Sequence, residues 1–171
     1  MYKIGDFIIY GSNGVCKIED IGISDIHGSD KNRIYYTLNP VYENSKIFVP
    51  VDTSVFMRPI ISYEEAQNII KRIPEMKEME CKEKNSRLLH AHYKDILQTH
   101  DCEELLAGMV GIYEKQMNAA NKGKKLGQID DKFMKVAEGL INDEFSIALG
   151  IPRDEVELYI KNKVKEIENN K

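Results

Sequence analysis

The residues that decide the fold are GDFIIYG at positions 5–11, SNG at 12–14 and KIFVPV at 46–51. Within this region, apolar runs rich in β-branched and aromatic residues are separated by Gly, Asn, Asp and Ser. Such a pattern is typical of a meander of short antiparallel strands joined by tight turns. The four strands that we expect on this basis cover residues 7–10, 15–23, 34–38 and 47–51.

The turns and the later part of the chain extend this prediction. Asn13 and Gly14 both tolerate a positive φ and therefore favour a hairpin. A sheet of such short strands must close or cover its edges, which favours a small barrel. From about Ser62 onward the pattern is helical. The predicted fold class is α+β, with an N-terminal small antiparallel Tudor/SH3-like β-barrel over 1–60 and a C-terminal all-α helical bundle over 61–171.

The last expected strand has a proline near its end. Proline cannot donate to a strand ladder, so Pro50 indicates a sheet edge or a strand end. An exposed edge at Ile47, Phe48 and Val49 can add itself to a partner's sheet through main-chain hydrogen bonds. The alternative is that these three side chains are simply part of the core.

A second binding hypothesis concerns three tyrosines of the same region. Tyr35, Tyr36 and Tyr42 would form an aromatic cage for a methylated lysine if their rings converged on one pocket. Tyrosine is also ordinary strand material, so the same residues fit a purely structural role.

The helical half carries clear boundary signals. Ser62 and Glu65 form a capping-box pattern, and Pro74 ends the helix that follows. Asp101 repeats the start signature, and Gly150 is the expected C′ glycine. The helices predicted from these signals run over 62–73, up to about His100, from Asp101, from Asp130 or Asp131, and from Pro152 to about Ile167, with Leu88 among the apolar positions of the second.

Charge and composition limit the possible classes of protein. The net charge of −4 argues against a free-standing nucleic-acid binder, although residues 71–94 carry seven basic and four acidic side chains. That patch can contact a few phosphates.

No apolar run approaches the roughly 18 residues of a membrane span, and no signal-like core is present, so a cytoplasmic protein is expected. The three cysteines at wide spacing do not resemble a disulfide framework.

Catalytic and metal-binding patterns are scarce. No nucleophile elbow, phosphate-binding glycine loop or zincin motif occurs. The nearest metal pattern combines His90 and His92 with His100 and Cys102, but positions i and i+2 of a helix point apart. We therefore expect a binding protein without enzymatic activity, cofactor or metal.

Residues of both halves resemble the CarD/CdnL family of bacterial transcription regulators. In the first half the resemblance rests on KIGD at 3–6, Tyr10, GV at 14–15, YYxL at 35–38, VP at 49–50 and RP at 58–59. In the second half it rests on Tyr113, Ala137, LI at 140–141 and the stretch from Glu144 through IALGI at 147–151. It covers nearly the whole chain.

The resemblance implies a partner for each half. In the family, the Tudor-like N-terminal domain docks on the β subunit of RNA polymerase by edge-to-edge strand contact. The helical domain contacts upstream promoter DNA without strong sequence specificity and stabilises the open complex. By position, the polymerase-binding residues would be Lys46, Ile47, Phe48, Val49 and Pro50, and the DNA-binding residues Lys82, Lys84, Arg87 and Lys94.

Two departures from the family pattern affect these expectations. The family commonly inserts a tryptophan at the edge of the melted DNA, where an apolar side chain replaces lost base stacking. This chain has no tryptophan, and residues 82–86, where it would lie, are polar. The stabilising effect should then be weaker, shifted to phosphate contacts, or lost. Phe48 also replaces an arginine that is common on the polymerase-facing surface.

A competing hypothesis from another class also fits the residues. The N-terminal half would be a Tudor-like peptide-binding module, and the helices would bind a partner outside transcription initiation. Convergence of the three tyrosines on an open pocket would favour it.

Overall fold

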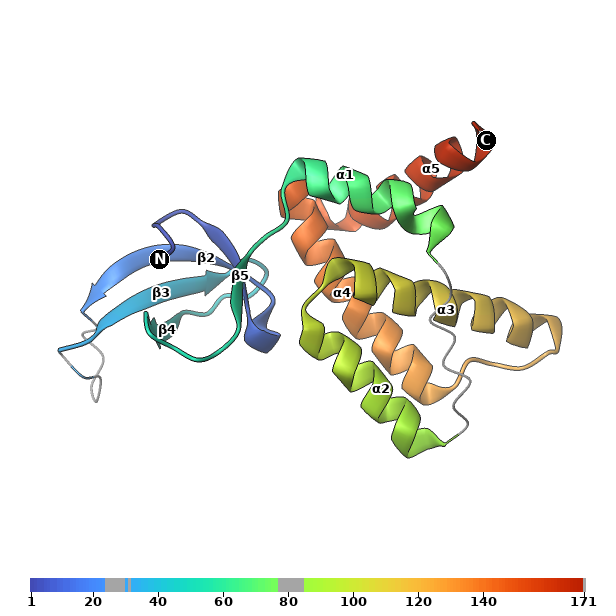
Figure 1. Ribbon diagram of the computed structural model, residues 1–171, viewed down its shortest axis with the longest axis horizontal. Helices are drawn as coiled ribbons and strands as arrows, with labels where there is room; N and C mark the ends of the chain where they lie inside the picture. The colour runs from blue at the N-terminus through green and yellow to red at the C-terminus, as the bar shows by residue number, and fades with distance from the viewer. Residues whose placement is uncertain (24–29, 31, 77–84, 171) are drawn as a thin grey trace. The chain divides into compact units, whose positions relative to one another are not determined.

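A computed structural model describes residues 1–23, 30, 32–76 and 85–170 (Figure 1). The chain divides into two compact units, Met1–Ile61 and Ser62–Lys171. Unit 1 contains a five-stranded antiparallel sheet, and unit 2 contains five α-helices within its described residues. The predicted α+β class, with β structure before α structure, is confirmed.

The sheet of unit 1 has the strand order β4-β3-β2-β1-β5. The strands are β1 (Phe7–Tyr10), β2 (Val15–Ile23), β3 (Ile34–Pro40), β4 (Ile47–Pro50) and β5 (Met57–Pro59). The apolar runs predict only four strands, and the fifth, β5, pairs antiparallel with β1. Its three residues are too few to show an alternating pattern, and a proline ends it.

One face of the sheet forms the core of unit 1. Ile8, Ile18 and Leu38 are fully buried there, and Tyr36 is 2% exposed. The register between β2 and β3 shifts between Ile18 and Asp20, where a bulge lets β2 change its curvature. Gly14, which begins the return of the chain into β2, has a φ of 68°, as expected for the turn between β1 and β2.

Unit 2 consists of α1 (Tyr63–Arg72), α2 (Ser86–Thr99), α3 (Cys102–Asn121), α4 (Gln128–Leu149) and α5 (Val156–Asn169). The capping box of α1 is present, because Ser62 Oγ accepts from Glu65 N and Glu65 Oε2 accepts from Ser62 N. Asp101 caps α3, and Gly150 ends α4 in the left-handed conformation. These three boundary predictions are confirmed.

Two other helix starts were predicted wrongly. Helix α4 begins at Gln128, with Gly127 as its N-cap, rather than at Asp130 or Asp131. Pro152 precedes a short 3-10 turn, Arg153–Glu155, and α5 begins only at Val156. In both cases a sequence signal lies near the start of the helix but is offset from it by two to four residues.

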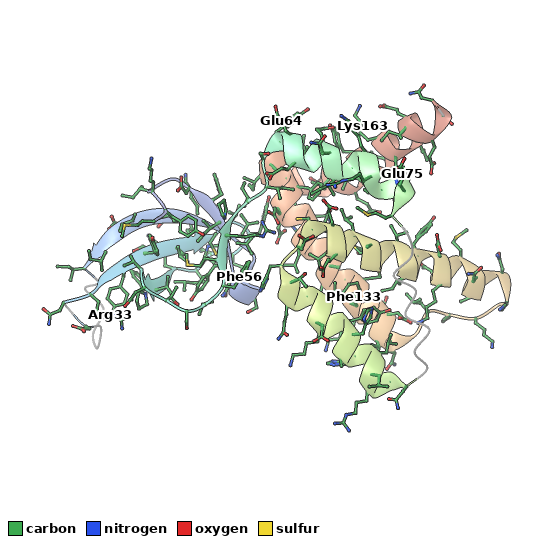
Figure 2. All side chains as sticks on the ribbon, viewed as in Figure 1. Arg33, Phe56, Glu64, Glu75, Phe133 and Lys163 are labelled. Atoms are coloured by element: carbon green, nitrogen blue, oxygen red, sulfur yellow. The ribbon has the colours of Figure 1, made fainter. Side chains whose placement is uncertain are left out.

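The core of unit 2 includes a contact between α2 and α4. The rings of Tyr93 and Phe133 stack with centroids 4.4 Å apart, and Figure 2 marks Phe133 on α4. Gly108 of α3 faces the same phenyl ring, where a Cβ atom would lie only 3.0 Å from Phe133 Cζ. The missing side chain therefore allows α3 to approach α4 closely. No helix among the described residues is long and apolar enough to span a membrane.

Candidate interaction surfaces

Strand β4 lies at one edge of the sheet. Its antiparallel partner β3 pairs Tyr36 with Val49 and Leu38 with Ile47. Within the described part of the chain, no strand pairs with β4 on its other side. The strand that the sequence analysis selected for partner binding is therefore an edge strand.

The ladder defines which backbone groups of β4 face outward. Val51 N donates to Ile34 O at 3.0 Å in the same register, so this is a hydrogen-bonded pair. Hydrogen-bonded and non-hydrogen-bonded pairs alternate along the ladder. The backbone N–H and C=O groups of Val49 and Ile47 therefore also point towards β3, whereas the backbone groups of Phe48 and Pro50 point away from it. The open edge thus offers both the N–H and C=O groups of Phe48, whereas the carbonyl of Pro50 accepts a hydrogen bond from Thr53 N at 3.0 Å.

The side chains of β4 divide between the two faces of the sheet. Val49 is buried in the core of unit 1, and Ile47 packs against that core. Phe48 is 39% exposed, and Pro50 is half-buried. The strand therefore combines both interpretations of the sequence. Ile47 and Val49 pack in or against the core, whereas the side chain of Phe48 is exposed at the edge.

Lys46 precedes β4 and takes part in a polar cluster. Its ammonium group lies 2.8 Å from Glu19 Oε2, and Asn39 Nδ2 donates to Glu19 Oε1 at 3.0 Å. The hydrogen bond from Lys46, followed by that from Asn39, lowers the pKa of Glu19. Glu19 and Asn39 were not selected from the sequence, because the bulge and the strand register that bring them to Lys46 leave no local signal.

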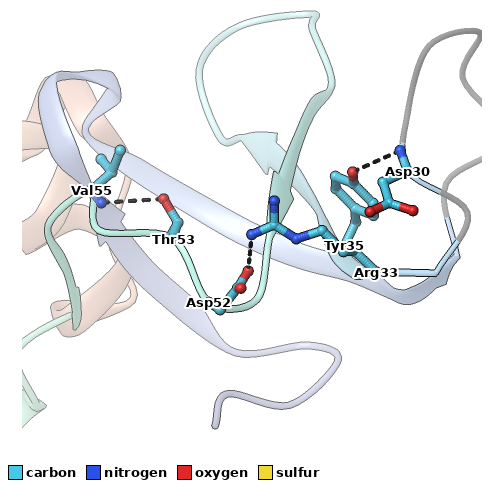
Figure 3. A network of polar contacts seen from close by, with 6 residues as sticks. All are labelled: Asp30, Arg33, Tyr35, Asp52, Thr53 and Val55. Atoms are coloured by element: carbon cyan, nitrogen blue, oxygen red, sulfur yellow. Dashed lines mark hydrogen bonds and ion pairs between the residues drawn. The ribbon is translucent and has the colours of Figure 1, made fainter.

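The opposite end of β4 is tied to β3 by an ion pair. Arg33 Nη2 lies 2.6 Å from Asp52 Oδ1, and the backbone of Asp30 donates to the hydroxyl of Tyr35 (Figure 3). The hydrogen bond from Arg33 is the main cause that lowers the pKa of Asp52. This pair holds the chain that leaves β4 against the start of β3.

The three tyrosines proposed as an aromatic cage do not converge. Tyr36 is buried in the core and accepts a hydrogen bond from Tyr2 N at 3.2 Å. Tyr35 is its neighbour on β3 and therefore points to the other face of the sheet. Without Tyr36 the proposed cage cannot form, and the hypothesis of methyl-lysine recognition at these residues is wrong.

The predicted DNA-binding residues lie partly within the described structure. Lys82 and Lys84 are outside the described residues, whereas Arg87 and Lys94 are both exposed on α2. Seven residues are almost two helical turns, so the two cations share one face of the helix. Lys94 also lines a groove of about 400 Å³ between α2 and α4, together with His90 and Lys132.

This α2/α4 groove has an apolar floor and a basic rim. Its apolar lining includes Tyr93, Leu97, Phe133 and Val136, of which Val136 is exposed. Lys132 is not predicted from the sequence, because it is distant from α2 in the chain and joins Lys94 and His90 only through helix packing. The arrangement can hold an anionic group next to an apolar or aromatic one.

The start of α2 presents an unexpected apolar residue. Asn85 caps the helix by accepting from the backbone N–H groups of Arg87 and Leu88. Leu88 was predicted to lie on the apolar side of the helix, but its side chain is 53% exposed. The predicted wedge region 82–86 is described only at Asn85 and Ser86, both of which are exposed and polar.

The histidine and cysteine residues do not form a metal centre in the described structure. Cys102 is buried, and its thiol donates to Glu144 Oε2 at 3.1 Å. His90 faces solvent, whereas Nε2 of His92 is buried without a hydrogen-bond partner. No group of three potential metal ligands occurs among the residues that the structure describes.

Unit 1 is similar to a known domain family. Residues 2–61, nearly the whole of unit 1, match the family model of the CarD-like/TRCF RID domain. This match supports a general RNA polymerase-interacting role for the unit. No curated protein matches the chain.

Proposed function

We propose that this chain, whose N-terminal unit belongs to the CarD-like/TRCF RID domain family, is a non-catalytic bacterial transcription regulator. Unit 1 docks on the β subunit of RNA polymerase. Unit 2 contacts upstream promoter DNA and changes the lifetime of the open complex.

The observation that carries the docking proposal is the open edge of β4. Its outward N–H and C=O groups can extend a sheet of the partner, as in other cases of strand addition. Phe48 supplies apolar contact area beside those hydrogen bonds, and Ile47 and Val49 keep the strand rigid from the core side. An edge held in this way loses little conformational freedom when it binds.

The DNA part of the proposal rests on the surface of α2. Arg87, Lys94 and Lys132 are exposed cations that contact phosphates, which gives affinity without sequence specificity. Leu88 lies next to Arg87 at the start of the helix and offers the apolar contact that a tryptophan gives in the resembled family. A leucine stacks less well than an indole ring, so its effect on open-complex lifetime should be smaller.

A polymerase pull-down tests the docking surface. Phe48→Glu and Pro50→Arg each place a charge on the edge and should weaken binding to the isolated β subunit at least about tenfold. Ile4→Glu is the matched control, because Ile4 is an exposed apolar residue outside β4 and should leave binding unchanged. Far-UV circular dichroism checks that each variant folds. Wild-type binding by both β4 variants would overturn the proposal.

Open-complex lifetime on a linear promoter tests the DNA surface separately. With wild-type polymerase binding retained, Leu88→Ala should shorten the lifetime several-fold, whereas Leu158→Ala, at an exposed leucine of α5, should not. Equal lifetimes for both variants would remove Leu88 from the proposal.

A further inference from the structure

Unit 2 has a second groove, which shares only α4 with the α2/α4 groove. It lies between α3, α4 and α5, has a volume of about 510 Å³ and is lined mainly by apolar side chains. Leu106, Val110, Met134 and Ile160 are among them. This volume is within the range of about 300–1,000 Å³ in which proteins bind ligands.

The charged residues at this groove are predominantly acidic. Glu114 of α3, Glu138 of α4 and Glu157 of α5 line it, and Lys161 is the single basic side chain among its lining residues. Lys161 forms an ion pair with Glu157. Glu114 and Glu138 form no ion pair within 4.0 Å in the described structure, and the lysines that act on Glu138 at longer range, Lys161 and Lys135, pair with Glu157 and Asp131 instead.

The carboxylate of Glu138 lies in an electrostatically unfavourable environment. Partial burial, and then repulsion from Glu157, raise the pKa of its side chain. A cation placed beside it would stabilise the charged carboxylate and so offset both effects. The DNA backbone would do the opposite, so this groove is unsuited to the ligand proposed for α2.

We propose that the α3/α4/α5 groove binds an amphipathic α-helix of another protein, with apolar side chains in the groove and Lys or Arg residues against Glu114 and Glu138. A helix satisfies its own backbone hydrogen bonds, whereas an extended peptide would need a free strand edge. No strand occurs among the described residues of unit 2. The site is independent of polymerase docking and of DNA binding.

Fluorescence anisotropy with the full chain tests this site. The probes are a helical Leu/Lys peptide of about 18 residues, long enough to form a stable helix, and a matched Leu/Glu peptide. The Leu/Lys peptide should bind, and the Leu/Glu peptide should bind at least about tenfold more weakly. Equal binding of both peptides would overturn the proposal.

Variants separate the groove from the overall negative charge of the chain. The double variant Glu114→Gln/Glu138→Gln should weaken binding of the Leu/Lys peptide about tenfold, and Val110→Asp should abolish it. The control Glu104→Gln/Glu168→Gln makes the same charge change at exposed positions outside the groove and should alter binding less than about twofold. Equal losses in both double variants would overturn the site.

Light scattering gives a further check. If the chain self-associated and Val110→Asp abolished that association, the occupant would be a second copy of the chain rather than another protein, and the proposal would be wrong. Circular dichroism of Val110→Asp establishes folding. The Gln variants are isosteric, so they keep the test valid if Val110→Asp does not fold.

Discussion

The hydroxyl of Tyr93 on α2 donates a 2.6 Å hydrogen bond to Oδ1 of Asp130, which is 2% exposed in the first turn of α4. Lys115 of α3 reaches the same carboxylate, with its Nζ 2.7 Å from Oδ2. Three helices therefore meet at one buried acidic group. Its charge is balanced by the ammonium group and the hydroxyl, which makes its burial tolerable.

Removing the tyrosine hydroxyl tests this junction. Tyr93→Phe should lower the free energy of unfolding of unit 2 by about 1–3 kcal/mol, because a hydrogen bond to a buried charge is lost. Urea unfolding followed by circular dichroism at 222 nm measures the change. Tyr63→Phe, at a mostly exposed tyrosine, should change it by less than about 0.5 kcal/mol. Similar values for the two variants would contradict a role for the junction in stability.

Two helix-interior glycines should respond to alanine in opposite directions. Gly108→Ala brings a methyl group within 3.0 Å of Phe133 and should destabilise the chain by about 1–3 kcal/mol, despite the better helix propensity of alanine. Gly139→Ala meets only Arg153 Nη2 at 3.7 Å, which is ordinary contact, so it should stabilise by about 0.5–1 kcal/mol. Thermal unfolding of both variants measures these changes, and stabilisation by Gly108→Ala similar to that by Gly139→Ala would show that packing at Gly108 is unimportant.

The thiol of Cys16 should be unreactive near neutral pH. Burial, with a smaller contribution from Glu43, raises its pKa from 9.0 to about 11. At pH 8 this higher pKa leaves about a hundredfold less thiolate than an unperturbed cysteine would have. Iodoacetamide labelling followed by mass spectrometry of the Cys16 peptide should show at least that protection relative to the denatured chain. Labelling of the native chain should keep rising up to about pH 11, and a plateau near pH 9 would contradict the shift.

The same shift predicts a pH dependence of stability. The folded state favours the neutral form of the Cys16 thiol. Its contribution to the free energy of unfolding is therefore fully present below pH 9, which is the pKa of the unperturbed group, and is lost as the pH rises towards about 11. The free energy of unfolding should fall in that window, and the fall should be smaller in Cys16→Ala. An identical pH profile for the wild type and the variant would argue against this contribution.

The salt dependence of DNA binding should reveal how many phosphates the cations of α2 and α4 contact. Each of Arg87→Gln, Lys94→Gln and Lys132→Gln should reduce the slope of log K against log salt by about 0.9, because each removes one phosphate contact. Lys165→Gln, an exposed cation on α5, should leave the slope unchanged. Titrations of a promoter fragment at several salt concentrations measure these slopes. A uniform effect of all four variants would indicate only a general charge effect.

Several features of the fold were predictable because they depend on residues close together in the chain. The capping box of Ser62 and Glu65 involves positions three apart, and Asp101 and Gly150 act within a single helical turn. The apolar runs of β1 and β2 similarly reflect their burial. Asp130 shows the limit of such reasoning, since an acidic residue near a helix start is expected in solvent, yet here it is buried by partners on two other helices.

The sequence by itself determined the class of fold, the change from strands to helices near Ser62, and β4 as the candidate binding strand, because propensity, turns and caps are local. Only the tertiary structure decided that Phe48 rather than Val49 carries the exposed side chain, that Tyr36 is in the core, and that Lys132 joins Lys94 beside one groove. These outcomes depend on strand register and helix packing, which bring together residues that are distant in the chain and are settled by the whole set of contacts at once.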